Sequence, residues 1–396
     1  MDNASSQRNH THLYVNDLPI PQPESEILPG DYLESIPAYS LKSLQLAAPA
    51  PPLTSQLDPL RRLLSRTHQL ESLHYRERGQ GTAFWFKHGE RLPAVKDLLL
   101  QSYQWTHSAE EVKEHWQLSN LTSLQLIDVS VFRFLISVRL EDLAEVKRLV
   151  FEDNIAHLDE DHREQATELM GELIHNHIKG LKSLKLTCSM PVLRLDSILQ
   201  HSGTLEDLKL RDHTGFEEDG NVCPSIEPEE LAVLSKRLQF VTTLELDMDT
   251  ALCDPVTFLQ AVSGFAKLQD LTLHVQTVLT AYENTQLDED QDYDAAISTL
   301  KLISHRREQL GLPLLRRLTV NVGGWRPVMI RRISAAWKEK NESGIFAERC
   351  FTFKREALCE EFTVMEEQCS EPPASCKSTP DLPEAIGMWN CFNELL

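Results

Sequence analysis

A six-residue pattern of apolar and polar positions recurs along the chain. Each copy has an apolar residue, two further residues, a leucine, one more residue, and then an apolar or aromatic residue. Ten copies occur, and their starts lie 24 to 47 residues apart. They are LKSLQL (41–46), LESLHY (70–75), VKDLLL (95–100), LTSLQL (121–126), VKRLVF (146–151), LKSLKL (181–186), LEDLKL (205–210), VTTLEL (241–246), LQDLTL (268–273) and LRRLTV (315–320). This recurrence indicates a repeated structural unit.

The fourth and sixth positions of each copy flank one residue that faces the other way, which is the period of a short β-strand. The segments between copies have helical spacing instead. Ser108 and Glu111 form a capping-box pattern, residues 161–180 run to a terminal glycine, and Asp254 precedes a proline at the start of another apolar segment. A strand followed by a helix, repeated, predicts parallel strands joined by right-handed crossovers.

This alternation resembles the leucine-rich-repeat proteins, and the similarity covers residues 36–345. The variable repeat lengths place it nearest the irregular repeats of fungal F-box-type proteins. The resemblance implies an α/β solenoid with parallel strands on its concave face and helices on its convex face. The Asn or Cys that regular repeats carry nine positions into each unit is present only as Asn154, so an evenly curved horseshoe is not expected.

We expect four segments in the chain. Residues 1–30 are polar and contain prolines, which predicts a disordered N-terminal segment. The solenoid then spans 31–345, and two alternating runs at 346–368 predict a hairpin that caps the last repeat. The tail at 369–396 is predicted to be mostly disordered until its final apolar residues.

Composition places the chain among globular proteins, since 41% of its 396 residues are hydrophobic and 25% are charged. A formal net charge of -21 opposes binding to nucleic acid or to anionic membranes over the whole surface. The N-terminus lacks the apolar segment of a signal peptide, and no run of about 18 apolar residues occurs. We therefore expect an intracellular protein of the cytoplasm or nucleus whose eight cysteines are reduced thiols.

Catalytic signatures are missing from the sequence. It contains no nucleophile elbow, phosphate-binding loop or zinc-protease motif. His175 and His177 lie two apart on a predicted helix and point in different directions. The acidic run at 288–294 resembles a calcium loop but has Tyr293 where the loop needs glycine and Thr299 where it needs glutamate. We expect no enzyme, no cofactor and no metal site.

Charge is distributed unevenly near the C-terminal end. Residues 301–340 contain ten lysines or arginines and only two acids. This basic segment is either neutralised within the molecule, by the acidic run before it or by neighbouring repeats, or it docks an acidic partner. The sequence leaves both interpretations open.

The expected function is non-catalytic binding of a protein partner on the concave face. The third, fifth and seventh positions of each unit are predicted to point outward there. The candidate binding residues in the central repeats are Arg148, Glu152, Lys185, Lys209, Arg211, Glu245 and Asp247. Neither nucleic acid nor a membrane is expected as partner, and the sequence does not identify the protein that is bound.

The family resemblance implies one alternative, a substrate-receptor subunit of a ubiquitin ligase. Such adaptors carry an F-box, and residues 27–37 echo its opening. The helices that should follow are absent, however, because the first repeat strand begins at Leu41.

Overall fold

The computed structural model describes residues 12–19, 32–47, 57–77, 82–153, 160–216, 222–275, 291–322, 349–355 and 362–368. Asn154, the first three residues of the acidic run, the basic segment beyond 322 and the tail from 369 lie outside these ranges.

Every copy of the six-residue pattern overlaps a strand. The strands are β2 (Leu41–Ala47), β3 (Ser72–Arg76), β4 (Asp97–Gln101), β5 (Ser123–Ile127), β6 (Arg148–Glu152), β7 (Ser183–Cys188), β8 (Asp207–Asp212), β9 (Thr243–Met248), β10 (Asp270–Val275) and β11 (Arg317–Val322). They lie side by side in sequence order, and each pairs with its neighbours in parallel. The predicted α/β class and parallel strands are confirmed.

The leucines of the pattern form the core. In β7, β8 and β9 the fourth-position residues Leu184, Leu208 and Leu244 lie directly beside one another and are at most 1% exposed. Burying one leucine contributes about 2 kcal/mol, so no single unit provides enough apolar burial and adjacent units must pack together.

Helices connect most of the strands. They are α1 (Asp58–Arg66), α2 (Ala109–His115), α3 (Val131–Ser137), α4 (Glu160–Glu172), α5 (Leu195–Leu199), α6 (Pro228–Arg237), α7 (Pro255–Val262) and α8 (Gln291–Gln309). Shorter helical turns occupy η1 (Tyr32–Ser35), η2 (Ala38–Ser40), η3 (Leu140–Leu143), η4 (Leu173–His177) and η5 (His213–Phe216), of which η4 is a π-helix.

Local sequence explains where the helices begin and end. The predicted capping box is present before α2, with the Ser108 hydroxyl accepting from the Glu111 amide and the Glu111 carboxylate accepting from the Ser108 amide. Asp254 caps α7 by accepting from the Thr257 amide at 3.0 Å. The helical segment from α4 through η4 is followed by Gly180, whose φ of +68° favours glycine.

One further strand was not predicted. β1 (Leu13–Pro19) pairs in parallel with β2, so the expectation of a disordered segment over all of 1–30 is wrong for these residues. The segment LYVNDLP lacks the leucine spacing of the repeated pattern and becomes ordered by adding a strand to an existing sheet edge.

The sheet changes direction at its C-terminal end. β12 (Arg349–Arg355) pairs antiparallel with β11, and β13 (Phe362–Gln368) pairs antiparallel with β12. Phe351 and Phe353 of β12 are fully buried, so the hairpin covers apolar surface that the last parallel strand leaves.

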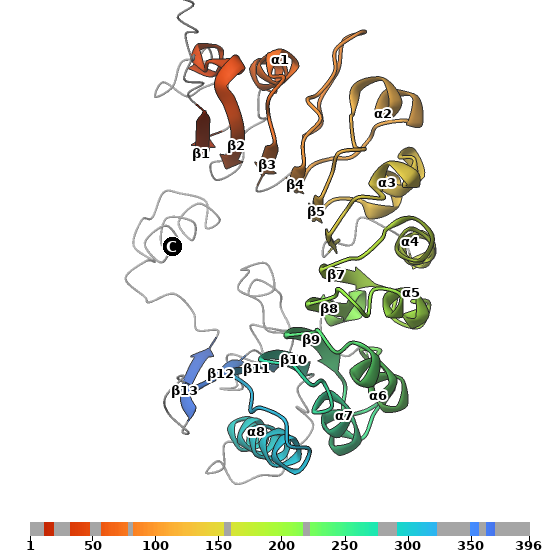
Figure 1. Ribbon diagram of the computed structural model, residues 1–396, viewed down its shortest axis with the longest axis vertical. Coiled ribbons are helices and arrows are strands. Elements are labelled where there is room, and N and C mark those ends of the chain that lie inside the picture. The colour runs from red at the N-terminus through yellow and green to blue at the C-terminus, as the bar shows by residue number, and fades with distance from the viewer. Residues whose placement is uncertain are drawn as a thin grey trace, which may run out of the picture.

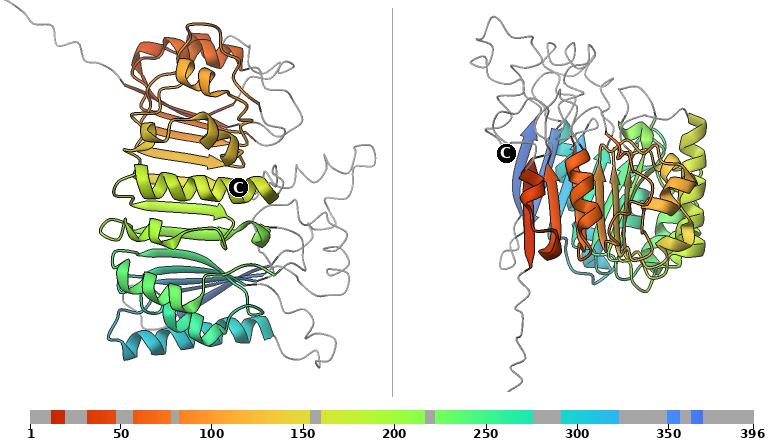
Figure 2. Two further views of the ribbon diagram at one scale, coloured as in Figure 1. Left: turned by 90° about the vertical axis from the view of Figure 1, so that its right-hand side faces the viewer. Right: turned by 90° about the horizontal axis from the view of Figure 1, so that it is seen from above.

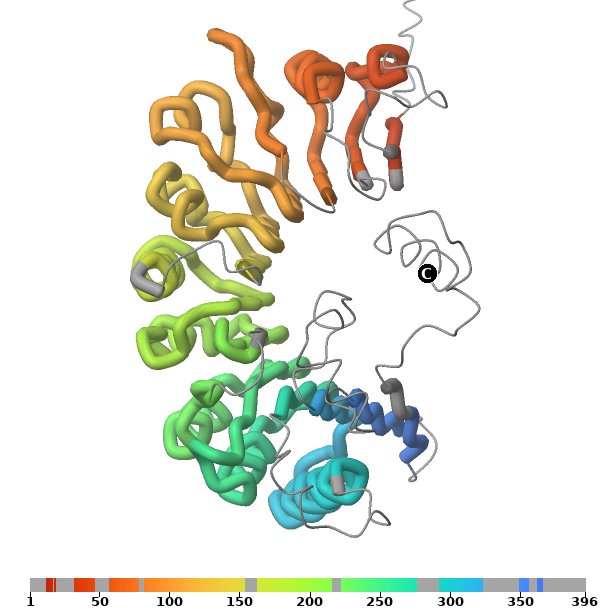
Figure 3. Tube along the Cα trace, turned by 180° about the vertical axis from the view of Figure 1, so that it is seen from behind, coloured from red at the N-terminus to blue at the C-terminus, as the bar shows by residue number. Residues whose placement is uncertain are grey.

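The molecule is curved. Figure 1 shows the strands along the inner side of an arc and the helices along its outer side, with β1 and β13 at opposite ends. The view from behind in Figure 3 shows the same arc, and Figure 2 shows the units stacked one upon the next. Side chains that alternate away from the leucine core therefore point to the inner side, which is called the inner face below.

Candidate functional site on the inner face

The inner face carries three rows of side chains, from the third, fifth and seventh positions of each unit. Because the strands are parallel and in register, each row runs across the strands rather than along them. The amino-end row contains Arg148, the middle row contains Lys185, and the carboxyl-end row contains Arg211. These rows differ strongly in their exposure to solvent.

The amino-end row is the accessible one in the central strands. Arg148 is exposed, while Ser183, Asp207 and Thr243 are half-buried. Asp207 accepts a hydrogen bond from the Ser183 hydroxyl at 2.9 Å and pairs with the Lys185 ammonium at 3.1 Å. This row presents hydroxyls and charges that a partner can reach.

An ion network occupies the middle of the face. The Lys209 ammonium lies 3.0 Å from Glu152 and 3.0 Å from Glu245, although Glu152 comes from β6, two strands away. Burial would lower the pKa of Lys209, but the charges of Glu245 and Glu152 raise it above its usual value. Lys209 therefore stays charged and holds the two carboxylates together.

His274 of β10 extends this network. Its Nε2 lies 2.9 Å from the Glu245 carboxylate. Burial and the nearby Arg211 guanidinium lower the pKa of His274. Burial would raise the pKa of the Glu245 carboxyl. The hydrogen bond to His274 and the charge of Lys209 outweigh burial and hold the pKa of Glu245 well below the usual range. A neutral imidazole that donates to an ionised Glu245 fits both directions.

The carboxyl-end row is buried, and here the sequence prediction is wrong. Arg211 and Asp247 were expected to point to solvent, but their side chains are 3% and 5% exposed and form an ion pair at 2.8 Å. Asp247 also accepts from the Asp212 amide at 2.8 Å, and Arg211 donates to the Gly215 carbonyl. The chain folds back over the strand end at η5, which alternation along the strand does not reveal.

The middle-row side chains of β4, β5 and β6 are also buried. Val150, another position expected to point to solvent, is 3% exposed, as is Leu99 at the equivalent position of β4. Gln125 lies between them on β5 and is 8% exposed. The accessible part of the face is therefore its amino-end row together with the middle of β7–β9.

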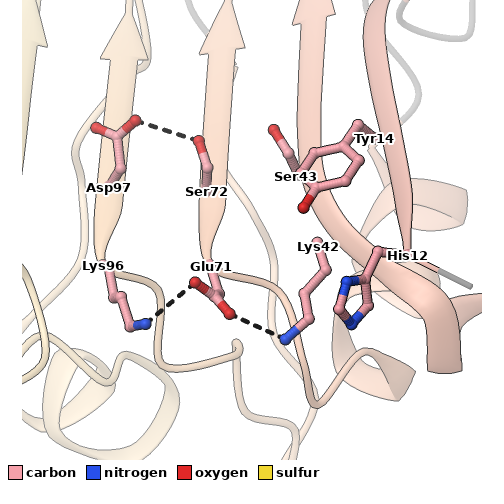
Figure 4. A pocket seen from close by; sticks show the side chains of 8 residues that line it. All are labelled: His12, Tyr14, Lys42, Ser43, Glu71, Ser72, Lys96 and Asp97. Carbon is pink, nitrogen blue, oxygen red and sulfur yellow. Dashed lines mark hydrogen bonds and ion pairs between the residues drawn. The ribbon is translucent and has the colours of Figure 1, made fainter. Parts of the chain in front are cut away.

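A shallow pocket of about 410 Å³ lies at the amino ends of β1–β4 (Figure 4). Glu71 lies between two lysines, 2.9 Å from Lys42 and 3.1 Å from Lys96. Their hydrogen bonds and charges lower the pKa of Glu71 to about 2. Ser72 donates to Asp97 at 3.2 Å, and Tyr14 lies beside Ser43 in the same view. The polar lining is largely paired within the molecule, as it is in the middle row.

The structure therefore divides the seven predicted residues into four groups. Glu152, Lys209 and Glu245 lie in one network, Lys185 pairs with Asp207, and Arg148 stands exposed beside them. Arg211 and Asp247 are buried. Asp207 and His274 were missed as site residues, although they occupy the third and seventh positions of their units and the repeat pattern marks both.

Among the described residues, no group of three or more His, Cys, Asp or Glu side chains is arranged to hold a metal ion. No helix within these ranges combines the length and apolar character needed to span a bilayer. Cys188 and Cys223 are free and buried, and burial raises the pKa of both thiols well above its usual value.

The chain was compared with known proteins by family model, by sequence and by structure. No family model, no curated protein and no solved structure matches it.

Proposed function

We propose that this chain is a leucine-rich-repeat solenoid whose inner face binds a protein partner and catalyses no reaction. The observation that carries the proposal is the accessible polar surface across β7–β9, where hydroxyls and charges of both signs stand on a single rigid sheet. Surfaces of mixed charge orient a partner and select against wrong ones. A sheet that is packed on one side holds these groups in place before binding, which reduces the ordering cost.

The sequential strand order supports the solenoid interpretation. Each unit contributes one strand and packs on its neighbours through leucines such as Leu208. Repeat proteins of this kind offer an extended curved surface rather than a closed cavity, and this suits a protein better than a small molecule.

Two matched variants test the proposal. Thr243→Arg with Thr272→Arg places two bulky cations on half-buried inner positions whose side chains make no hydrogen bond within the described ranges. Val233→Arg with Val256→Arg makes the same chemical change on α6 and α7, where the side chains are 50% and 45% exposed. Each protein is immobilised and used to capture binding proteins from the cells that produce it, followed by mass spectrometry.

We expect the wild type and the outer variant to retain the same specific partner, and the inner variant to lose it. Circular dichroism and thermal melting confirm that all three proteins are folded. Retention of the partner by the inner variant, or its loss from the outer variant alone, would place the binding surface elsewhere.

A further inference from the structure

Four cations gather where the chain enters β6 and β7. They are Lys147, Arg148, Lys179 and Lys182, and they are called the basic rim. Arg148, Lys179 and Lys182 are exposed, and Lys147 is half-buried. The rim lies at the amino ends of the strands, directly beside the accessible row of the inner face.

Backbone pairing brings these residues together. The amide of Lys182 donates to the carbonyl of Lys147 at 2.8 Å, and Arg148 lies opposite Ser183 in the parallel pair. The positive φ of Gly180 turns the chain so that the Lys147 ammonium donates to the Lys179 carbonyl at 2.6 Å. The grouping is therefore fixed by the fold and does not depend on flexible side chains meeting by chance.

The basic rim differs from the neighbouring charges because it lacks carboxylate partners within the described part of the chain. Lys42 and Lys96 share Glu71, Lys185 has Asp207, and Lys209 has two glutamates. None of the four rim cations has a carboxylate within 4.0 Å among the residues whose ion pairs are described, and Lys147 is engaged by a carbonyl oxygen. Glu206 lies next to the rim, since its amide donates to the Lys182 carbonyl at 2.8 Å, but its carboxylate forms no ion pair with a rim cation among the described residues.

An unpaired cationic group is notable on a chain with a net charge of -21. Parallel strands lie about 4.8 Å apart, so the entrances of β6 and β7 present their cations close to one another. An anionic group that binds between them gains charge-assisted hydrogen bonds from more than one side chain. The negative charge on the rest of the protein repels a long polyanion. A short acidic segment is influenced mainly by the nearby cations of the rim.

We propose that the basic rim binds an acidic segment of a protein partner and thereby sets the orientation of that partner on the inner face. This inference rests on the proposed function, since it names the chemistry of the group bound at one edge of the same face. Arg148 belongs to both the rim and the amino-end row, so a segment held there is directed toward the Ser183 hydroxyl and the Lys185 ammonium, which pairs with Asp207. Lysine and arginine both bind carboxylates through charge-assisted hydrogen bonds, which are stronger than neutral ones.

The probe is a fluorescein-labelled peptide of eight glutamates, whose binding is followed by fluorescence anisotropy at low and at physiological ionic strength. The test variant is Arg148→Glu with Lys182→Glu. The matched control is Lys236→Glu with Arg237→Glu, which makes the same charge change at two exposed positions on α6. We expect the wild type and the control to bind the peptide in a salt-sensitive manner, and the rim variant to bind about tenfold more weakly or worse.

Three results would overturn the inference: no binding to the wild type at low salt, equal weakening in the rim and control variants, or tighter binding of duplex DNA or of phosphatidylserine vesicles than of the peptide. The proposed function has its own readout. If Thr243→Arg with Thr272→Arg abolishes partner capture while the peptide fails to bind, only the assignment of the rim is wrong. If the peptide binds at the rim but the inner variant keeps its partner, the inner-face proposal fails instead.

Discussion

Arg211 of β8 and Asp247 of β9 form a buried ion pair, with a guanidinium nitrogen and a carboxylate oxygen 2.8 Å apart. Asp247 also accepts a hydrogen bond from the Asp212 amide, and the Arg211 guanidinium also donates one to the Gly215 carbonyl. The pair thus joins two strands to the turn that follows one of them. A Cβ atom at Gly215 would lie only 2.9 Å from the Arg211 side chain, so a larger residue there would force the ion-paired guanidinium to shift.

Removing one member of this ion pair should lower the stability of the folded protein. Asp247→Ala removes the carboxylate that pairs with the buried Arg211 guanidinium and accepts from the Asp212 amide, and we expect a loss of about 3–5 kcal/mol in the free energy of unfolding. Urea denaturation measures it. Glu71→Ala, which removes a half-exposed carboxylate from its two lysines, serves as the control and should cost far less. Equal losses in the two variants would contradict the structural role of the buried pair.

The leucine core gives a second prediction. Leu208→Asp places a carboxylate where the side chain is 1% exposed between β7 and β9. An uncompensated buried charge costs several kcal/mol, so we expect loss of cooperative melting or of soluble expression. Leu252→Asp is the control because Leu252 is 51% exposed. Near-native melting of Leu208→Asp would show that the fourth position does not face the core.

A buried carboxyl group predicts a pH dependence. Burial, and to a smaller extent the charge of Asp128, raises the pKa of Asp153 to about 7. The folded state therefore binds more protons than the unfolded state between about pH 4 and pH 7, and Asp153 lowers stability as the pH rises through this window. Asp153→Asn should remove a penalty on the order of 4 kcal/mol at pH 8 and have little effect at pH 4. Urea denaturation at the two pH values checks this, and equal effects at both would contradict it.

His107 should make the folded protein more stable as the pH rises, which is the opposite of the effect of Asp153. Burial lowers the pKa of its imidazole to about 4, against a weaker raising effect of Glu111. The unfolded state then binds more protons than the folded state between about pH 4 and pH 6.5, so stability rises with pH across that range. We expect the free energy of unfolding of the wild type, minus that of His107→Gln, to increase from about pH 4 to about pH 6.5 and then to level off, because the other titrating groups cancel in this difference. A flat profile would show that the imidazole is not shielded from water.

Most of the sheet was predictable because its signal is local. A leucine at the fourth position and an apolar residue at the sixth specify which side of a strand is buried, and this holds from Leu44 to Leu318. The capping residues Ser108 and Asp254 could also be predicted, because a capping side chain accepts a hydrogen bond from an amide only three residues later in the sequence. β1 could not be found this way because its order depends on the edge of β2.

The sequence predicted which side chains lie on the inner side of the sheet, but not how exposed each of them is to solvent. Alternation placed Lys209, Arg211 and Asp247 on the correct side of the sheet. It could not show that η5 folds over the ends of β8 and β9, or that Lys209 reaches a glutamate two strands away. Exposure depends on segments distant in sequence, and a repeated pattern carries no information about them.

The strict order of the strands has a mechanical consequence. In the described sheet each inner strand is hydrogen-bonded only to the strand before it and the strand after it, so most of a load applied to the two ends passes through the junctions in series. We expect such a molecule to behave first as a spring, with small changes at many junctions adding up to a visible opening of the arc. At higher force we expect the weakest junction to yield first, and we expect it to lie outside β6–β8, where the Lys209–Glu152 ion pair adds a contact across two junctions.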